Sequence, residues 1–556
     1  MTSEVDALVV GAGPVGMTLA WELHRHGMSC RVVEKNAART DKSKALVLWS
    51  RTLEALHAMG GADAFVAAGM EAHGASLYAG GRRLVHLEFG GIESVYAYAL
   101  MIPQSETERL LEERLATLGI AVERSAELVA LERKGDGAVA TVRRKGGSDE
   151  RIRARWLLGC DGAHSAVRHL LDVPFAGDAE PNDWVLADVH VRGPIAPDEV
   201  SAYFHASGIL VFFPISPGRF RVIADQGLAH GYDHPPDPTL AAMQALVDER
   251  GPSGVALADP IWLAGFRIHE RKVAHYRPAE RVFLAGDAAH IHSPAGGQGM
   301  NTGMQDAFNL AWKIGLVHRG RGRAQPLLDS YDVERGAVGE AVLRQAGIVT
   351  RMATLRSPIA QSIRNRLYAF LGSVSAVQSH AATLLSELAV HYRKSPLSGE
   401  HRGRGAHAWL LGAGAAPGDR MPDADLRDAA TGRPVRILDL LRTPAHRLLA
   451  LAGVDGGGTP GAAAHEVTAS ARAAARRYGD AIATSLVVPA RCEPPRSAAD
   501  GGEAVLVDDG GALHRALGAA LPTLVLVRPD GYVGFRSQPA DASALAAHLG
   551  TYLIPV

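Results

Sequence analysis

The sequence is poor in cysteine, in long apolar runs and in net charge, and each shortage argues against a class of protein. The three cysteines, Cys30, Cys160 and Cys492, are too few and too widely spaced for a disulfide framework or a metal site. No apolar run reaches the roughly 18 residues of a membrane span. A net charge of −1 offers no electrostatic case for nucleic acid or an anionic membrane. No basic segment precedes the first apolar strand, so we expect no signal peptide and a reducing cytoplasm.

The composition that remains is that of a globular protein with more than one domain. Hydrophobic residues make up 47% and charged residues 21% of 556 residues. The first informative stretch is an apolar strand followed by Gly11-x-Gly13-x-x-Gly16, an amphipathic helix and a second strand that ends in Glu34. This spacing is typical of a dinucleotide-binding βαβ unit, in which Glu34 binds a ribose. A chance glycine turn is the alternative.

Two later strands also end in acidic residues. An apolar strand over 155–159 leads into Cys160-Asp161-Gly162, and another over 282–285 leads into Gly286-Asp287. Asp287 is placed to accept hydrogen bonds from ribose or ribityl hydroxyls. Asp-Gly after a buried strand is also a common turn, so Asp161 by itself does not indicate a ligand.

A Pro/Gly-rich turn over 293–299 precedes a long helical pattern over 300–317. The glycines let backbone approach a flat ligand, and a helix start offers unpaired N–H groups that can hold an anionic ring edge. The loop over 36–48 contains three cations, including Lys44, that either reach a ribose or pyrophosphate or simply face water. Gln104, at the start of a predicted helix, either faces water or contacts a cofactor ring.

Period-two segments over 182–225 predict an antiparallel sheet inserted into the first domain. We expect a first domain over 1–180 and 265–395 with a helical extension, and a substrate sheet over 181–264 that also takes in about 72–103. After a linker near 403–417, residues 418–556 alternate strands and helices in a thioredoxin-like order. This part contains no C-x-x-C, so thiol exchange is not available to it, and packing or assembly is the favoured role.

Together, GAGPVG with Glu34, Cys160-Asp161-Gly162 and LAGDAAHIHSPAGGQGMN resemble the three fingerprints of single-component FAD-dependent aromatic hydroxylases. This group includes p-hydroxybenzoate hydroxylase and phenol hydroxylase, and the layout is most similar to that of bacterial aromatic polyketide hydroxylases. The resemblance spans about 5–390, and the C-terminal part resembles the thioredoxin-like appendage of phenol hydroxylase. It implies an α/β fold with a Rossmann-like FAD-binding domain, an inserted antiparallel-sheet substrate domain and a thioredoxin-like C-terminal domain.

The resemblance also implies roles by position. Lys44 stands where the family usually has an arginine, and lysine lacks the bidentate fork. Asp161 would serve both FAD and NAD(P)H, and Pro294 and Gly297 would form the loop at the reacting flavin ring, with no acid or base assigned. The implied cofactor-binding residues are Gly11, Gly13, Pro14, Gly16, Glu34, Lys35, Lys44, Gln104, Asp161, Gly286, Asp287, Pro294, Gly297, Gly299, Met300 and Asn301.

The implied reaction uses FAD, O2 and NADPH or NADH, and transfers one oxygen from a flavin C4a-hydroperoxide to an electron-rich ring. The expected partner is a small aromatic substrate, not nucleic acid or membrane, and the protein would be a monomer or homodimer. Candidate substrate-lining residues are Phe212, Phe213, Arg221 and Phe266, although an aromatic at strand spacing is more often core. His290 and His292 have no third ligand at metal spacing, so we assign them to loop structure and expect no metal.

Three other functions stay open. A Baeyer–Villiger oxygenase, or an enzyme that inactivates an antibiotic by oxidation, would use the same scaffold. A flavoprotein that only binds an aromatic ligand would share the cofactor motifs. A flavin halogenase is disfavoured, because the W-x-W-x-I-P segment of that family is missing.

Overall fold

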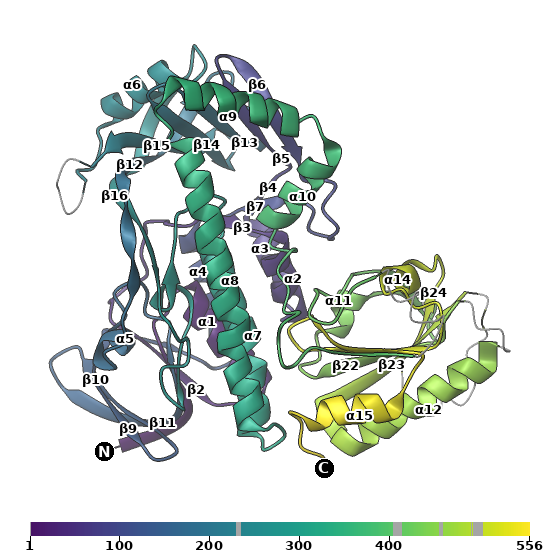
Figure 1. Cartoon of the computed structure of the whole chain (residues 1–556). Helices are drawn as coiled ribbons and strands as arrows, with labels where there is room; N and C mark the ends of the chain where they lie inside the picture. The colour runs from purple at the N-terminus through teal and green to yellow at the C-terminus, as the bar shows by residue number, and fades with distance from the viewer. Residues whose placement is uncertain (1, 230–234, 404–413, 455–459, 491, 493–503) are drawn as a thin grey trace.

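The computed structural model describes the chain except residues 1, 230–234, 404–413, 455–459, 491 and 493–503 (Figure 1). The predicted linker near 403–417 therefore falls largely outside the described residues. Among the described helices, none combines the length and apolar character that crossing a membrane requires. The thiols of Cys30 and Cys160 are free, and burial raises the pKa of Cys30 to about 12, as expected for inert thiols.

The first sheet carries the nucleotide motif. Its strand order is β8-β2-β1-β11-β10-β9, and β17 pairs with β11. Strands β1, β2, β8, β11 and β17 run parallel, whereas β9 and β10 form an antiparallel meander on β11. Helix α1 packs against α4 and α7. The bounds are β1 Thr2–Val10, α1 Pro14–Arg25, β2 Cys30–Glu34, α4 Gln104–Thr117, β8 Val122–Arg124, β9 Ala126–Lys134, β10 Gly137–Arg144, β11 Asp149–Gly159, α5 Ala166–Leu170, β17 Val282–Leu284 and α7 Gly299–His318.

The second sheet is the predicted insertion, and all but one of its strand pairs are antiparallel. The order is β18-β16-β12-β15-β14-β13-β5-β6, with β13 and β5 parallel. The 17-residue strands β12 and β16 extend below the rest of this sheet towards the first domain (Figure 1). The bounds are β5 Gly74–Ala79, β6 Arg82–Glu88, β12 Ala176–Arg192, β13 Glu199–His205, β14 Gly208–Ser216, β15 Arg219–Leu228, α6 Leu240–Arg250, β16 Ala256–Lys272 and β18 His290–Ile291.

The two faces of this sheet bury different groups. Helix α6 covers one face, where Val185, Phe212 and Val222 pack against Met243 and Val247. Helices α8, α9 and α10 belong to the other side, and α8 runs along the length of the N-terminal part (Figure 1). At 1.5 Å per residue, its 30 residues measure about 45 Å. The bounds are α8 Ala324–Ala353, α9 Pro358–Leu371 and α10 Ser375–Leu385.

A small sheet and two short helices lie between the larger units. Strands β3, β7 and β4 pair in that order, and α2 packs against α7. This sheet brings segment 47–49 to the start of α7, where it takes part in the candidate site. The bounds are β3 Val47–Leu48, α2 Ser50–Ala58, α3 Ala62–Ala68, β4 Met70–Ala72 and β7 Ala99–Met101.

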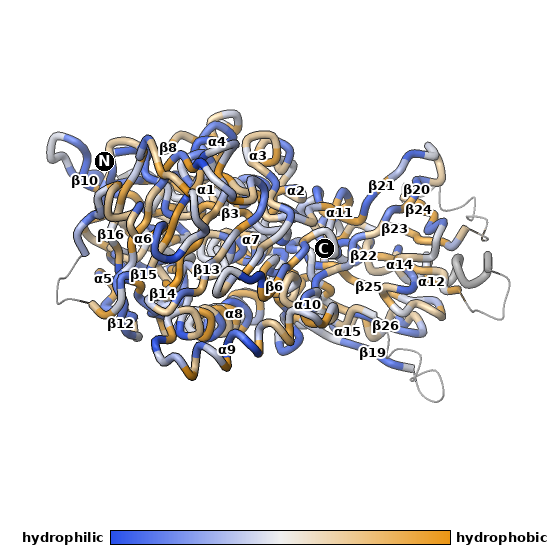
Figure 2. Tube along the Cα trace, turned by 90° about the horizontal axis from the view of Figure 1, so that it is seen from above, coloured by the Kyte–Doolittle hydropathy of each residue, from blue (hydrophilic) through white to orange (hydrophobic). Residues whose placement is uncertain are grey.

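The C-terminal domain is a separate lobe that packs beside α2 and α7 (Figure 1). Its core order β26-β25-β22-β23 joins two parallel strands to an antiparallel hairpin and agrees with the thioredoxin-like order expected from the sequence. Strand β19, at 399–402, pairs with β26 at the edge of this sheet, although it precedes residue 418, where the C-terminal domain was expected to begin. Viewed from above, apolar segments run through the strands of both lobes (Figure 2). The bounds are β19 Gly399–Arg402, β20 Asp425–Asp428, β21 Pro434–Arg436, α11 Ile437–Leu440, β22 His446–Leu451, α12 Pro460–Tyr478, β23 Ile482–Pro489, β24 Ala504–Asp508, α14 Ala512–Ala516, β25 Thr523–Val527, β26 Val533–Gln538 and α15 Ala542–Gly550.

A buried ionic cluster joins this lobe to the helices of the first domain. Arg528, just after β25, donates to Glu334 of α8 at 2.6 Å and to Asp530 at 2.5 Å. Lys313 of α7 donates to the same Glu334 at 2.7 Å, and all four side chains are buried. Burial lowers the pKa of Lys313 to about 8, although Glu334 favours its charged form. The cluster fixes the C-terminal half of α7, the helix whose first turn faces the candidate site.

Candidate active site

The three acidic strand ends predicted from the sequence lie side by side at one edge of the first sheet. Val10 is in register with Val33 on one side and with Gly159 on the other, and Gly159 is in register with Leu284. Backbone hydrogen bonds continue past the strand ends, from Gly11 N to Val33 O (2.8 Å), from Cys160 N to Val10 O (2.8 Å) and from Ala285 N to Gly159 O (3.0 Å). Parallel strands present their carboxyl ends at one edge, the usual ligand site of such sheets.

Each glycine of the first motif suits its position for a different physical reason. Gly11 has φ +102°, and a Cβ there would lie 2.4 Å from Cys160 O. A Cβ on Gly16 would lie 2.0 Å from Gly11 O, so this glycine allows helix and strand to pack. Gly13 has ordinary backbone angles, and its Cβ would meet nothing within 4 Å. Gly13 thus leaves open space before the first turn of α1, which starts with Pro14 and has no side-chain cap.

A cleft of about 450 Å³ opens from this edge. Glu34 stands in its wall with its carboxylate fixed by backbone donors, Ala12 N at 3.0 Å and Asn36 N at 2.9 Å. Each oxygen keeps a lone pair, so the carboxylate can also accept from the hydroxyl pair of a ribose. Residues that line the cleft include Gly11, Gly13, Glu34, Lys35, Arg39, Glu108, Arg124, Asp161, Gly162, His164 and His169.

Asp161 and Asp287 are carboxyls that the protein leaves partly unsatisfied. Asp161 Oδ2 accepts from Val167 N at 3.1 Å, whereas Oδ1 is buried and has no partner in the described part of the chain. Burial raises the pKa of Asp161. Asp287 is accessible to water, yet protein surrounds it closely enough for desolvation to raise its pKa, with His290 and Lys44 acting in the opposite direction. Carboxyl groups that lack a full set of protein donors are suited to a ligand that supplies hydroxyl donors.

The Pro/Gly-rich loop before α7 has the tight geometry expected of it. Gly296 and Gly297 have φ +89° and +65°, and Gly297 N donates to Pro294 O at 2.9 Å. Gln298 caps α7 without a side-chain bond to its N–H groups, because its amide donates to Leu384 O at 2.9 Å. The first N–H groups of α7 therefore receive no side-chain cap and carry the positive end of the helix dipole.

A buried polar network supports this loop from behind. Asp306 of α7 accepts from Gly286 N at 3.0 Å, from Arg335 Nε at 2.6 Å and pairs with His290 Nε2 at 2.8 Å. His292 Nδ1 lies 2.8 Å from Ser293 O, and burial lowers the pKa of His292 to about 4. Both histidines therefore have a protein partner within or behind the loop. Within the described residues, no group of three or more His, Cys, Asp or Glu side chains is arranged to hold a metal ion.

A second, apolar cavity of about 230 Å³ shares this loop as a wall. The second sheet contributes one wall, and β3, α8, α9 and α10 contribute others. Among the described residues that line it, none is Asp, Glu, Lys, Arg or His. Lining residues include Val47, Trp49, Leu77, Phe89, Trp184, Ala202, Phe204, Ile209, Val211, Phe213, Ile223, Ile268, Pro294, Gly297, Val349, Thr350, Tyr368 and Leu385.

Comparison with known proteins decides the family. Residues 4–346 match the family model described as "FAD binding domain", and residues 414–553 match "Aromatic-ring hydroxylase, C-terminal". The chain is 36% identical to 6-methylpretetramide 4-monooxygenase of Streptomyces rimosus over 100% of this chain and 95% of that protein. It is 31% identical to pentachlorophenol 4-monooxygenase of Sphingobium chlorophenolicum, over 96% and 94%. The structure of the OxyS anhydrotetracycline hydroxylase of Streptomyces rimosus matches this protein over 100% of both chains, with 28% identity and a TM-score of 0.76.

The chain is an FAD-dependent aromatic-ring monooxygenase. The predicted family, enzyme class and cofactors are thereby confirmed, as is the mixed α/β fold with an FAD-binding domain. The residues found here fit FAD, because Gly13 leaves a cradle that a larger side chain would fill and Asp161 Oδ1 is an orphaned acceptor beside it.

The cavity of the monooxygenase contains one of the four residues predicted to line it. Phe213 lines the cavity, but Phe212 points to the opposite face and packs under α6, so that prediction is wrong. Successive strand residues alternate between faces, and neighbours cannot both line one cavity. Phe266 stacks on Trp184 at 6.5 Å and does not itself line the cavity.

Arg221 is also not part of the cavity wall, which corrects the prediction for this residue. It is buried and bidentate to Asp188 at 2.8 and 2.9 Å, lies over the ring of Trp262 and donates to Lys44 O at 3.0 Å. The sequence shows the arginine but not its distant carboxylate. Arg221 therefore ties the loop that contains Lys44 to the second sheet.

Other predicted cofactor residues of the monooxygenase already have protein partners. Gln104 Oε1 accepts from Ala45 N at 3.1 Å, and its Nε2 donates to Glu108 at 2.8 Å. Asn301 accepts from Trp49 N at 2.8 Å and donates to Val47 O and Gly297 O, both at 2.9 Å. In this structure both amides shape the site by holding its loops.

Several cleft residues were not predicted from the sequence. Glu108 follows Gln104 by one helical turn, which is the only local signal for it. Arg124 ends β8, the strand next to β2, and its guanidinium pairs with Glu112 at 2.8 Å. His164 and His169 follow the Cys160-Asp161-Gly162 turn. Only the strand order shows that these positions face the same cleft as Glu34.

Proposed function

We propose that this monooxygenase inserts one oxygen atom into a phenolic, multi-ring substrate of polyketide type, with NADPH or NADH as reductant. The observation that carries the proposal is the position of one loop: residues 293–297 border an apolar cavity and lead directly into the uncapped start of α7. Names of relatives support the substrate class, among them 6-methylpretetramide 4-monooxygenase and anhydrotetracycline monooxygenase of Streptomyces rimosus.

We assign the cofactor-binding roles as follows. Gly11, Gly13, Pro14 and Gly16 receive the pyrophosphate at the start of α1, and Glu34 binds the adenosine ribose, with Lys35 beside it. Asp161 and Asp287 accept from hydroxyls, and Gly286 positions Asp287 through its bond to Asp306. The loop and the first turn of α7 face the flavin ring through Pro294, Gly297, Gly299, Met300 and Asn301, with Lys44 and Gln104 near its edge.

When bound, FAD supplies the oxygen-transfer chemistry, so the protein has to bind, orient and exclude water. The positive end of α7 stabilises negative charge at the ring edge that it faces. The apolar walls keep water from the reacting centre, and none of the described lining residues is a carboxylate or histidine that would compete for the substrate proton. The tight turn at Gly296 and Gly297 brings backbone, without side chains, to the wall of the apolar cavity.

The decisive experiment follows NADPH and NADH oxidation with and without a panel of multi-ring phenols, and analyses the products by mass spectrometry. We expect stimulated oxidation and a product heavier by one oxygen. A lactone or a ring-opened product would replace hydroxylation by Baeyer–Villiger chemistry. Tight binding without any turnover would contradict the proposal and support a ligand-binding flavoprotein.

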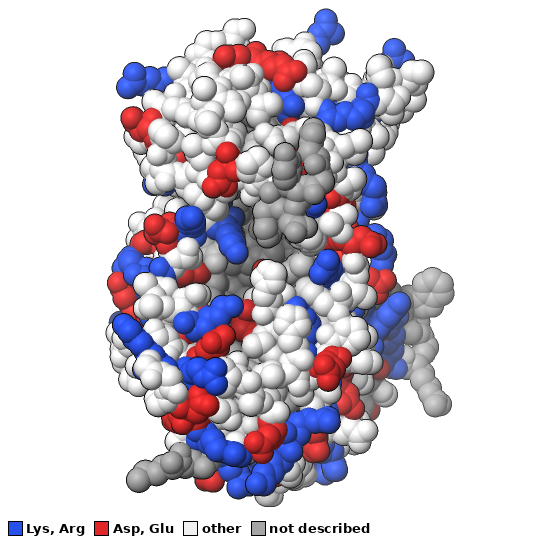
Figure 3. Space-filling view, turned by 90° about the vertical axis from the view of Figure 1, so that its left-hand side faces the viewer, with Lys and Arg blue, Asp and Glu red and all other residues white. Residues whose placement is uncertain are grey.

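We also propose a cytoplasmic enzyme that acts on small molecules as a monomer or homodimer. The free thiols of Cys30 and Cys160 fit a reducing compartment. On the face in Figure 3, Lys/Arg and Asp/Glu side chains are interspersed, with no patch of one sign that would suit nucleic acid. Light scattering would measure the oligomeric state directly.

A further inference from the structure

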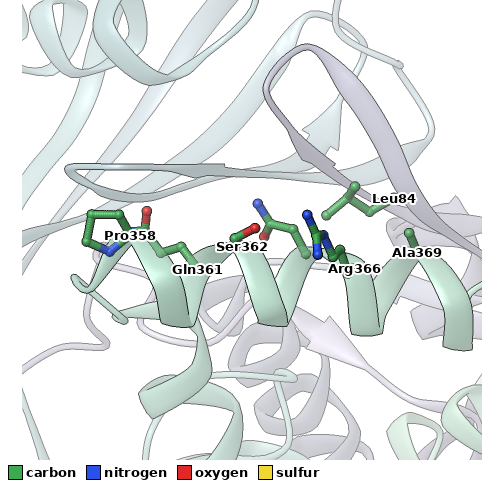
Figure 4. A pocket seen from close by; sticks show the side chains of 7 residues that line it. Leu84, Pro358, Gln361, Ser362, Arg366 and Ala369 are labelled. Carbon is green, nitrogen blue, oxygen red and sulfur yellow. The ribbon is translucent and has the colours of Figure 1, made fainter.

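Helix α9 covers the apolar cavity, and two polar side chains on its inward face are hydrogen-bonded to backbone carbonyl groups. Gln361 donates to Leu355 O at 2.7 Å and to Ala206 O at 3.2 Å, and Arg364 donates to Met352 O at 2.9 Å. These bonds fix α9 to the end of α8 and to the β13–β14 turn. Figure 4 shows the neighbouring side of the helix, where Gln361, Ser362 and Arg366 lie along a surface groove beside Leu84 of β6.

Tyr368 lies one turn beyond Arg364 and also turns inward, where it lines the cavity. Its ring stacks on Phe204 at 5.8 Å with an interplanar angle of 9°, while the Arg364 guanidinium lies 3.9 Å from the centre of the same Phe204 ring. An aromatic ring held between a helix and a sheet in this way has few rotamers available. The orientation of Tyr368 is thus set by packing.

The Tyr368 hydroxyl is one of two side-chain polar groups of the cavity wall that make no hydrogen bond to the described residues. Trp49 Nε1 donates to Gly296 O at 2.9 Å, and Thr350 Oγ1 donates to Ser293 Oγ at 2.6 Å. Trp184 Nε1 lacks a partner but is sealed from water. Across the part of the chain that the structure describes, the Tyr368 hydroxyl makes no hydrogen bond, and unlike Trp184 Nε1 it is not sealed.

We infer that Tyr368 is a specificity-determining residue whose hydroxyl donates a hydrogen bond to an oxygen substituent of the aromatic substrate. The inference rests on the proposed function and deepens it, because it states how an apolar cavity selects an oxygenated ring over a bare hydrocarbon. One fixed donor among apolar walls sets which ring edge lies against the loop at 293–297. Burial raises the pKa of Tyr368, so the hydroxyl stays protonated at neutral pH and can act as a hydrogen-bond donor.

The test compares Tyr368→Phe with Tyr203→Phe in the FAD-loaded enzyme. Tyr203 precedes Phe204 on β13, stacks on Tyr78 at 4.9 Å and belongs to the α6 side of the sheet. Dissociation constants are measured by fluorescence for two pairs of probes, 1-naphthol with naphthalene and 1,8-dihydroxyanthraquinone with anthracene. Each pair differs in its oxygen substituents.

We expect Tyr368→Phe to weaken binding of both oxygenated probes about tenfold, the usual worth of one such hydrogen bond, and to leave the hydrocarbons within about twofold. Tyr203→Phe should change neither pair. Equal weakening of phenols and hydrocarbons, or no change in either, would overturn the inference. If the wild type binds the oxygenated probes more tightly through Tyr368 but never oxidises NADPH or NADH faster in their presence, the proposed function fails and the hydrogen bond stands. A wild type that binds none of the four probes overturns both.

Discussion

The acidic cleft and the apolar cavity are built from opposite materials. The cleft is walled by strand ends and carries Glu34, Asp161 and several cations. The cavity is walled by strand faces and helices, and its described lining contains no charged residue. Strand ends provide backbone groups and carboxylates that must meet a ligand, whereas strand faces provide side chains that would otherwise form a core.

Under the proposed assignment of FAD to the cleft and substrate to the cavity, this difference separates two tasks. The cleft has to hold a large polar cofactor, and charged groups and helix dipoles do this with high specificity. The cavity has to keep water away from a reactive centre while it accepts a flat apolar molecule. Mutations on the two sides should therefore affect cofactor affinity and substrate affinity separately.

The largest effect on ligand affinity is expected for Gly13→Val in the cleft. The backbone angles at Gly13 suit any residue and no protein atom lies within 4 Å of a Cβ, so the apoprotein should fold with nearly unchanged stability. The side chain would occupy the space of the pyrophosphate, and FAD affinity should fall roughly 100-fold or more, about 2.7 kcal/mol. Flavin fluorescence measures the dissociation constant, and thermal unfolding measures the apoprotein.

Gly336→Ala is the matched control, because this glycine of α8 also has open space around it and lies away from the cleft. It should bind FAD as the wild type does. Equal FAD affinity of Gly13→Val and wild type would contradict the placement of the pyrophosphate.

Phe212 and Phe213 allow a direct test of the two faces of the second sheet. Phe212→Ala should destabilise the protein by about 3–5 kcal/mol through the cavity it leaves under α6, with unchanged substrate affinity in the folded fraction. Phe213→Ala should raise the dissociation constant of a multi-ring phenol about tenfold and leave FAD affinity unchanged. Denaturant unfolding and ligand titration separate the two outcomes, and an exchange of the two phenotypes would refute the assigned faces.

A smaller effect on FAD affinity is expected for Asp287→Asn. The same substitution should change the stability of the apoprotein by an amount that depends on pH. The amide is a weaker acceptor for a ligand hydroxyl, so FAD affinity should fall roughly tenfold. Desolvation by the surrounding protein raises the pKa of Asp287 in the folded protein, although the side chain is accessible to water, so the charged carboxylate slightly disfavours the folded apoprotein.

The two apoproteins should be equally stable below about pH 4, and the variant should become relatively more stable as pH rises through the unfolded and then the folded pKa. Unfolding curves between pH 4 and 8 check this sign. A variant that loses stability relative to the wild type with rising pH would show that the carboxylate is stabilised by partners in the fold.

The smallest effect is expected for Lys44→Arg, which restores the residue usual in the family. The Lys44 side chain is exposed, and its fixed contact is a backbone carbonyl bond to Arg221, which the substitution leaves in place. FAD affinity should change less than about threefold, although arginine offers a bidentate fork. A change of more than tenfold would place residue 44 directly on the cofactor.

Much of the cofactor side was predictable from sequence because its signals are local. Gly11, Gly13 and Gly16 occur at fixed spacing, and the acidic residues Glu34, Asp161 and Asp287 lie within three positions of the last residues of β2, β11 and β17. Glycine conformation and strand polarity depend on neighbours along the chain. Asn301 and Gln104 were predicted to face the cofactor, but their hydrogen bonds to 45–49 join segments far apart in sequence and were not foreseen.

The residues that line the cavity were much harder to predict, since the sequence pattern does not distinguish an apolar residue in the core from one that lines a cavity. Alternation predicts two faces of a strand but does not say which face the substrate meets, and this is why Phe212 was misplaced. Tyr368 gave no signal at all, as its helix comes about 160 residues after the strand that carries Phe204. Covalent neighbours thus determined the glycine turn and the acidic strand ends of the cleft, whereas only the packing of distant elements decided which side chains surround the apolar cavity, because burial is a property of the folded surface.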